Sequence, residues 1–345
     1  MLKKGFTKQH LCLVLFLLFN FSTFSQMSID ESNIQDPLKK LLPSFYPELK
    51  KPIKSFIYII DKDTISKSYY SRNGNESIQM DYEKNKPFYK SIYKYNGNLK
   101  TETRFFINDM LQSTTTFKYD QNKNLAEWKA IKTVYDKKTS TVTQVHDIHW
   151  LIEFDKNKKV KRKISVDASN VKTLSYEYFY DAANRLTEAN ELQWKDKYEY
   201  ENGLLTKKYR VFKNDNSIYS SSEFKYNREN LLIESIDKYY LTEYRYDALG
   251  LKNIHYTNRK DNTQQDIALF YKNNALTRVE INTTDINLKP AFYFKSDFLY
   301  FSWNKTGMNK LSLEFSYDQH NNVTEIKYFI KDVYKYSKFF IYEYY

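Results

Sequence analysis

Two histidines in the stretch HDIH, His146 and His149, have the residue types of a metal site. With Asp147 between them, they offer two imidazoles and a carboxylate, all of which can bind zinc. On a regular β-strand, however, residues three apart point to opposite faces. The spacing also supplies no third ligand on the same face. We therefore expect no metal site here.

The sequence has none of the usual catalytic motifs. It contains no Gly-x-Ser-x-Gly elbow, no phosphate-cradling glycine loop and no His-Glu-x-x-His. The single cysteine, Cys12, lies in an N-terminal apolar run that we expect to be removed. The chain is therefore predicted to act without a thiol nucleophile, a bound nucleotide or another cofactor, and not to be an enzyme.

Repeated carboxylates leave one enzymatic alternative open. Glu127, Glu188 and Glu325 recur at similar places in strand-like phrases and would lie along one face of a sheet. A glycosidase needs one pair of carboxyl groups with distinct roles. Equivalent glutamates on a solvated face more often discourage aggregation between sheet edges. A polysaccharide hydrolase that uses sheet carboxylates is therefore the second alternative, behind a non-catalytic function.

The tryptophans are the best candidates for ligand contact. Exposed aromatic planes stack on sugar rings or insert into a protein partner, and Trp128, Trp150 and Trp194 occur where the repeated phrases differ from one another. Core packing is the competing interpretation for each of them. Trp303 takes the place of a repeat tyrosine and is expected in the core.

The elements that must position these side chains are repeated aromatic strands. A phrase of the form Tyr-x-Tyr-Asp recurs along the chain, and between Tyr180 and Tyr246 its copies are spaced by 20, 26 and 20 residues. Such a period predicts an array of β-hairpins. Alternation of aromatic and polar residues places the rings on one face, which we expect to be the core. The tyrosines of the phrase include Tyr95, Tyr119, Tyr180, Tyr200, Tyr226, Tyr246 and Tyr317.

Turns separate the predicted strands. Gly97 and Gly203 stand in Asn-Gly pairs and Gly250 in YDALGL, and Asn-Gly is a strong hairpin signal because both turn residues reach positive φ. Asn184 is expected in the left-handed conformation in its repeat, as are Asn124, Asn230 and Asn321 in theirs. Second strands such as LTEANEL place apolar residues three apart, which predicts a bulge.

At these residues the chain resembles the YD-repeat, or RHS-repeat, family. YFYDAANRLTE (178–188) and YRYDALGLKNI (244–254) are the phrases most similar to the family pattern, and the resemblance covers about 93 to 326. It implies hairpins joined edge to edge into one long, curled antiparallel sheet, which in large members closes into a shell around a cargo domain. We expect too few units here to enclose a domain, and no effector domain after the array. We therefore expect an all-β fold with an open, solenoid-like sheet or a partial shell.

The N-terminus predicts export. Lys3, Lys4 and Lys8 precede the apolar run 11–21, and Thr23 and Ser25 suit a signal-peptidase site, so residues 1–25 are a predicted signal peptide. The run is shorter than a spanning helix needs, and we expect no transmembrane anchor after cleavage. A proline-rich leader is predicted over 26–54 and the repeat domain over 55–345. The periplasm, the cell surface and the extracellular space all remain open.

The charge of the chain argues against nucleic acid as a partner. Lysine and arginine number 54 against 42 aspartates and glutamates, and the two signs are interleaved along the sequence. Our main hypothesis is a secreted β-repeat protein that presents a curved aromatic surface to a glycan or an envelope protein. The first alternative is an outer-membrane β-barrel, suggested by alternating strands and the aromatic C-terminal residue Tyr345.

Overall fold

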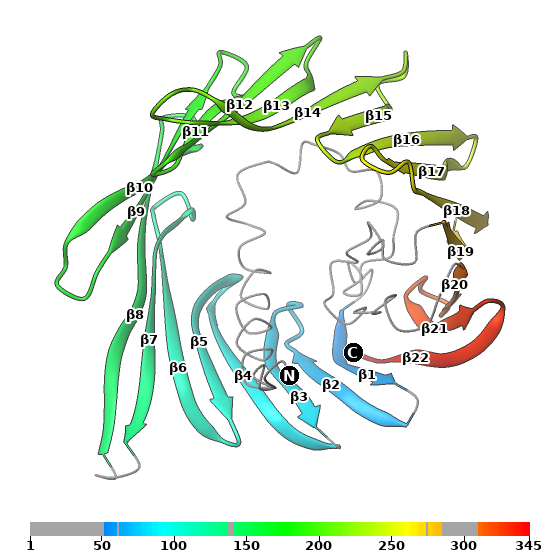
Figure 1. The fold of residues 1–345 in the computed structure, drawn as a ribbon. Helices are drawn as coiled ribbons and strands as arrows, with labels where there is room; N and C mark the ends of the chain where they lie inside the picture. The colour runs from blue at the N-terminus through cyan, green and yellow to red at the C-terminus, as the bar shows by residue number, and fades with distance from the viewer. Residues whose placement is uncertain (1–51, 61, 84, 137–140, 274, 285–309) are drawn as a thin grey trace, which may run out of the picture.

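The protein folds as one antiparallel sheet of 22 strands (Figure 1). The computed structural model describes residues 52–60, 62–83, 85–136, 141–273, 275–284 and 310–345, and these contain no helix. The predicted signal peptide, nearly all of the predicted leader and Trp303 lie outside the described residues. No helix long and apolar enough to cross a membrane occurs in the part of the chain that is described. The all-β prediction is confirmed.

The strands follow one another in short connections. The first eleven are β1 (Ile53–Ile60), β2 (Asp63–Tyr70), β3 (Glu76–Glu83), β4 (Lys86–Asn96), β5 (Leu99–Ile107), β6 (Met110–Tyr119), β7 (Leu125–Asp136), β8 (Thr141–Phe154), β9 (Val160–Val166), β10 (Lys172–Tyr180) and β11 (Leu186–Asn190). The remaining eleven are β12 (Trp194–Glu201), β13 (Leu204–Phe212), β14 (Ile218–Tyr226), β15 (Leu232–Asp237), β16 (Tyr240–Asp247), β17 (Gly250–Asn258), β18 (Gln264–Lys272), β19 (Ala275–Thr283), β20 (Lys310–Tyr317), β21 (Val323–Ile330) and β22 (Val333–Tyr344).

The sheet closes into a barrel. Each strand pairs with the next, and β1 pairs antiparallel with β22, where Ile57 lies opposite Ile341 and Tyr58 opposite Phe340 (Figure 1). The expectation of an open or partial shell was therefore wrong. Pairing between the two ends of the chain leaves no signal in the local periodicity of the sequence, which is why the expectation failed. Closure is favourable because it removes two sheet edges with unpaired N–H and C=O groups. A closed barrel fits the outer-membrane alternative better than it fits an open binding surface.

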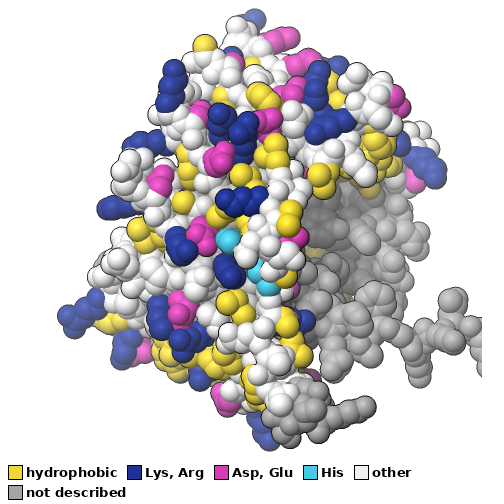
Figure 2. Space-filling model, turned by 90° about the vertical axis from the view of Figure 1, so that its left-hand side faces the viewer, with side chains coloured by type: hydrophobic (Ala, Val, Ile, Leu, Met, Phe, Trp, Pro, Cys, Tyr) yellow, Lys and Arg dark blue, Asp and Glu magenta, His cyan; other side chains and the backbone are white. Residues whose placement is uncertain are grey.

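The two faces of the sheet differ in chemistry. Residues paired directly across two strands point to the same side, so each face can be followed around the barrel. The outer surface that contains β7–β10 shows Lys and Arg interleaved with Asp and Glu (Figure 2). On these strands the charged side chains, such as Arg162 between Glu153 and Glu177, occupy the polar positions of the alternation. The polar face is thus the outer one, and the aromatic face is the inner one.

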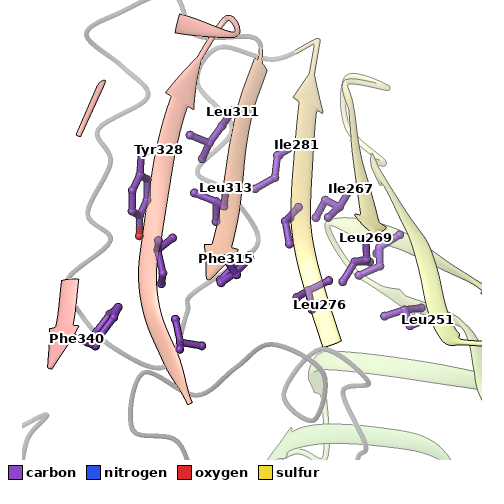
Figure 3. Close-up of a cluster of buried hydrophobic side chains, with 14 of the residues drawn as sticks. Leu251, Ile267, Leu269, Leu276, Ile281, Leu311, Leu313, Phe315, Tyr328 and Phe340 are labelled. Carbon is purple, nitrogen blue, oxygen red and sulfur yellow. The ribbon is translucent and has the colours of Figure 1, made fainter. Parts of the chain in front are cut away.

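The inner face is most tightly packed on β17–β22 and β1. Its buried residues include Leu251, Ile254, Ile267 and Val279, each at most 1% exposed. Leu311, Leu313 and Phe315 on β20 lie beside Ile281 on β19 and Tyr328 on β21 (Figure 3). This cluster confirms that the aromatic and apolar positions of the repeat form the core.

The repeat turn is built by one carboxylate and one left-handed residue. The Oδ1 atom of Asp181 accepts hydrogen bonds from the backbone N–H groups of Ala183 and Arg185, both at 2.9 Å, and Asn184 has a φ of 61°. Equivalent turns follow Asp120, Asp155, Asn227 and Asp318. In the turn after Asp120 the left-handed residue is Lys123, so the expectation that Asn124 takes this position was wrong.

The predicted bulge lies in the second strand of each of these hairpins. Phe179 pairs with Glu188 and Tyr180 with Leu186, which leaves Thr187 as the extra residue. The same shift leaves Ile233 unpaired with β14, because Lys225 pairs with Glu234 and Tyr226 with Leu232. The bulge returns the leucine that starts the second strand to the inner face, where it meets the repeat tyrosine.

Tyrosine hydroxyl groups connect successive hairpins. The hydroxyl group of Tyr246 donates a hydrogen bond of 2.8 Å to the carbonyl oxygen of Leu232, the first residue of the preceding second strand. The same bond, at 2.6–3.0 Å, is made by Tyr119, Tyr180, Tyr200, Tyr226, Tyr271, Tyr317 and Tyr342. Each bond joins two adjacent strands that belong to successive hairpins, so it fixes the register of one hairpin against the one before it.

Removing one of these hydroxyl groups should weaken the barrel measurably. We expect Tyr246→Phe to lower the free energy of unfolding by about 1 kcal/mol, because the ring stays in place while the Leu232 carbonyl loses its donor. Urea denaturation followed by tryptophan fluorescence measures the change. Tyr239→Phe is the matched control, since Tyr239 is 59% exposed and should be neutral. Equal effects of the two substitutions would contradict the structural role of the bond.

Candidate functional site on the inner face of the barrel

Trp128 and Trp150 form a pair on the inner face. They are direct cross-strand partners on β7 and β8, and Phe117 on β6 is paired with Trp128 on the other side. The ring of Trp150 lies 6.1 Å from that of Tyr176 on β10. Both indoles are partly exposed, unlike the closed core on β17–β22. The two strands therefore bring two of the predicted binding tryptophans together.

Trp194 belongs to a second aromatic group on the same face. It is partly exposed at the start of β12, with its ring 4.1 Å from Phe212 and 4.9 Å from Tyr219. The guanidinium group of Arg210 lies 5.9 Å from the Trp194 ring. Two hydrogen bonds of 2.6 and 2.7 Å hold Arg210 on the carboxylate of Asp196. Trp194 is thus separate from the Trp128 and Trp150 pair.

A polar group that the sequence analysis missed lies on β3–β5. Around the barrel the residue paired with the repeat aromatic across the hairpin is apolar, as with Leu125, Val160, Leu186, Leu205, Leu232, Leu251, Leu276 and Val323. In the first two hairpins this residue is Glu76, opposite Tyr70, and Lys100, opposite Tyr95. Aligning the hairpins on the residue after each turn would have shown this exception.

Further polar side chains extend this group across the inner face. The hydroxyl group of Tyr93 donates to Gln79 Oε1 at 3.0 Å, and Gln79 Nε2 donates to Asp81 Oδ1 at 3.4 Å. The Lys100 ammonium lies 4.4 Å from the centre of the Tyr93 ring. We call Glu76, Gln79, Asp81, Tyr93 and Lys100 the inner polar group. Buried hydroxyl residues continue the polar surface on β2, β5 and β6, namely Ser66, Ser68, Thr103, Ser113 and Thr115.

Burial perturbs the acid and base groups of the inner polar group. It raises the pKa of Asp81 to about 7, with the Gln79 hydrogen bond opposing the change and the Glu76 charge adding to it. Burial also raises the pKa of Glu76 and lowers that of Lys100. The negative charge of Glu76 opposes the change in the pKa of Lys100. Asp81 is therefore the member of the inner polar group whose pKa lies near neutral pH.

The outer glutamates that suggested a hydrolase are paired with lysines. Lys118 Nζ lies 3.0 Å from Glu127 Oε2, Lys195 Nζ lies 3.5 Å from Glu188 and Lys327 Nζ lies 3.8 Å from Glu325. Their positions on the charged outer face are equivalent. They supply no carboxyl pair with distinct roles.

The two histidines of HDIH lie on the same face, contrary to expectation. Ala130 pairs with Ile148 and Ile131 with His146, so Asp147 is an extra residue that reverses the alternation. The two imidazole rings are 6.1 Å apart, and His149 Nε2 lies 3.2 Å from Glu127 Oε1. Nevertheless, among the described residues no group of three or more His, Cys, Asp or Glu side chains is arranged to hold a metal ion.

The predicted turn residues take different turn geometries. Asn202 and Gly203 both have positive φ, at 50° and 85°, as a type I′ hairpin requires. Gly97 has a φ of 59°, and Asn96 and Leu99 form the strand pair that flanks the turn. Gly250 has a φ of 121° and pairs with Asp247.

No family model matches the sequence, and no significant match was found among curated proteins. The chain does show weak similarity to solved structures. The crystal structures of TcdB2-TccC3-Cdc42 and TcdB2-TccC3 give TM-scores of 0.36 at 9% and 8% identity over 76% and 77% of this chain. This chain spans 19% of the length of each of those chains.

Two porin-like proteins are also similar in structure. Those of Bacteroides uniformis and Bacteroides vulgatus give TM-scores of 0.27 and 0.23 at 7% and 9% identity. The matches cover 85% and 84% of this chain and 98% of each porin-like chain. At these scores none of the four likenesses bears on function, and the YD-repeat resemblance remains a prediction from the motifs.

The raised pKa of Asp81 predicts how stability depends on pH. Between its ordinary value of 3.8 and about 7 the folded chain holds a proton on Asp81 that the unfolded chain releases. The free energy of unfolding should therefore fall as pH rises through this window. Asp81→Asn should reduce that fall and stabilise the protein at pH 8 relative to wild type, as measured by urea denaturation across pH.

Asp181→Asn provides a control of opposite sign. Backbone and side-chain hydrogen bonds from Arg185 lower the pKa of Asp181, so its contribution to stability is present at neutral pH and lost as pH falls below its ordinary value. An unchanged pH profile in Asp81→Asn would refute the assignment of the proton to Asp81.

Proposed function

We propose that this protein is an exported, non-catalytic β-barrel of the cell envelope that binds a glycan on the inner face of its barrel. The observation that carries this proposal is the Trp128 and Trp150 pair, two partly exposed indoles held side by side by direct cross-strand pairing. Aromatic planes of this kind stack on the apolar faces of sugar rings. Export is supported by the predicted signal peptide over 1–25.

The inner polar group supports the same ligand class. Sugars present many hydroxyl groups, which pair well with carboxylates and with side-chain amides that both donate and accept. Glu76, Gln79 and Asp81 offer these groups on β3, and the Tyr93 hydroxyl is already bonded to Gln79. The aromatic part of a sugar-binding surface, on β6–β10, and the polar part, on β2–β6, thus lie on the same inner face.

Binding without catalysis is part of the proposal. The outer glutamates are equivalent and paired with lysine, as described above, and the inner carboxylates Glu76 and Asp81 lie in a group whose members already contact one another. Glu76→Gln also tests the hydrolase alternative. If polysaccharide cleavage were observed and this change abolished it, the protein would be an enzyme.

Replacing the paired tryptophans should weaken glycan binding. We expect Trp128→Ala and Trp150→Ala each to reduce affinity for an envelope polysaccharide about tenfold, the loss of one stacking contact. Isothermal titration with fractionated cell-envelope glycans measures the affinity. Phe179→Ala is the control, because Phe179 is 43% exposed and is paired with the outer residue Glu188. Wild-type affinity in both tryptophan variants would disprove an inner binding face.

A second candidate function is an outer-membrane β-barrel. It is favoured by the closed, sequential antiparallel sheet, which is the arrangement such proteins need. The outer face opposes it over most of the circumference. His255, in the middle of β17, lies 2.6 Å from Asp266, and Lys225, near the end of β14, lies 2.6 Å from Glu234, on strands that lipid would have to surround. Each lysine at the bilayer midplane would cost about 2–4 kcal/mol.

Fractionation distinguishes the two candidates. We expect the mature protein to leave the membrane fraction in alkaline carbonate without detergent, because the paired charges of the outer face favour water. Immunoblotting of the soluble and pelleted fractions provides the measurement, with a known outer-membrane porin as control. Retention in the pellet until detergent is added would favour the outer-membrane barrel.

A further inference from the structure

One arc of the barrel has an outer face unlike the rest. A row of directly paired residues crosses β22 and β1–β5 in the order Ile341, Ile57, Lys67, Met80, Lys90 and Phe106. We call these six residues the outer apolar row. Phe106 is on the same side of β5 as Glu102 and Arg104. Glu102 pairs with Thr116 on β6, and Thr116 pairs with Lys129 on the charged outer face of β7. The row therefore lies on the outer face.

A second row strengthens the apolar character of this arc. Tyr69, Ile78 and Ile92 are paired with one another on the same face of β2, β3 and β4. Ile341 is 50% exposed and Phe339, its neighbour on the same face, is 37% exposed. Across β14–β18, by contrast, the outer row reads Lys225, Glu234, Glu243, His255 and Asp266.

The inner face of two strands in this arc, β2 and β3, is more polar than the inner face elsewhere. On β2 and β3 the inward residues include Ser66, Ser68, Gln79 and Asp81 beside Tyr70, whereas most inward residues of β17–β20 are aliphatic or aromatic, with Gln265 as a buried polar exception. Alternation puts the apolar residues of a strand toward whichever side is not water. On β2 and β3 that side is the outside. These two strands therefore have the polarity of a sheet that contacts an apolar medium outside the barrel, whereas β1 still turns Phe56 and Tyr58 into the inner core.

The two lysines indicate what that medium is. Lys67 Nζ lies 4.9 Å from the centre of the Tyr69 ring, and Lys90 Nζ lies 5.7 Å from that of Phe106. The Lys90 ammonium group also lies 3.8 Å from the carboxylate of Asp109. Lysine stems that cover aromatic and aliphatic surface are typical of protein surfaces at a membrane interface. A second copy on this face would bring lysines toward lysines, which like-charge repulsion opposes. Without the predicted signal peptide, which contains three lysines, 51 basic residues remain against 42 acidic ones, a net charge of +9.

We propose that the outer apolar row docks the barrel sideways on an anionic lipid surface. The apolar residues enter the headgroup boundary, and Lys67 and Lys90 pair with lipid phosphates. The contact is centred on β1–β3, because the outer face carries ion pairs on either side: Glu325 with Lys327 on β21, and Glu102 with Lys94 and Arg104 on β4 and β5. One further ion pair, Lys54 with Glu343 at 2.7 Å, lies beside Ile341 at the end of the row. The barrel lies on the membrane and does not span it.

Vesicle binding by the purified mature protein tests this proposal. Wild type should co-sediment with phosphatidylglycerol vesicles and bind phosphatidylcholine vesicles more weakly. We expect Ile341→Asp to lower the affinity at least about tenfold, because a carboxylate must enter the apolar boundary. Lys67→Gln and Lys90→Gln should each lower affinity for the anionic vesicles about fivefold.

Phe270→Asp is the matched control. Phe270 is 44% exposed and paired with the outer residue Arg278, so it lies on the outer face of β18 in the charged part of the barrel. This variant should bind vesicles as wild type does. Ile341→Ser replaces Ile341→Asp if circular dichroism shows that the aspartate variant is unfolded. The vesicles contain no glycan, so the outcome is independent of the proposed sugar binding.

Three results would overturn the proposal. The first is equal vesicle binding by Ile341→Asp and wild type. The second is a dimer in light scattering that Ile341→Asp dissociates, in the absence of vesicle binding, which would assign the row to a second copy of the chain. The third is vesicle-bound protein that resists alkaline carbonate, which would indicate insertion.

Discussion

The hydrogen-bonded pairing of β1 with β22 is the constraint on which the rest of the structure depends. Once the first and last strands are joined, every residue of the sheet lies either inside or outside. Because side chains alternate strictly along a strand, the register of this one pair is tied to the register of all the others. A slip by one residue would turn the aliphatic core of β17–β22 toward solvent.

The tyrosine hydroxyl bonds protect that register. Each reaches the carbonyl group of a residue in the preceding hairpin, so neighbouring hairpins are joined by a side-chain bond in addition to the ladder. The Asp181 type of turn and the bulge at Thr187 bring the tyrosine and the following leucine to the same face. The repeated phrase therefore specifies both the strand and its position relative to its neighbour.

The contacts proposed for the barrel lie where the repeats differ. Most hairpins pair the repeat tyrosine with an apolar residue, and their uniform pattern yields an apolar inside and a charged outside. Glu76 and Lys100 interrupt the pattern on the inside, and the outer apolar row interrupts it on the outside of the same strands. On β2 and β3 the barrel thus combines a largely polar inner face with an apolar outer face, and the tryptophan pair lies further around the inner face on β7 and β8.

Local patterns in the sequence determined the all-β class, the hairpin repeat, the bulge and the shared face of the aromatic rings, because each depends on residues that are neighbours in the chain. Tertiary structure alone decided that the sheet closes, since β1 and β22 are separated by almost the whole chain and their pairing has no local signal. It also decided which side of the sheet is inside. Register between strands decides that Trp128 faces Trp150, that His146 and His149 share a face, and that Glu76 and Lys100 lie on the same inner face. Register is set by the pairing of distant segments, so no single repeat could show it.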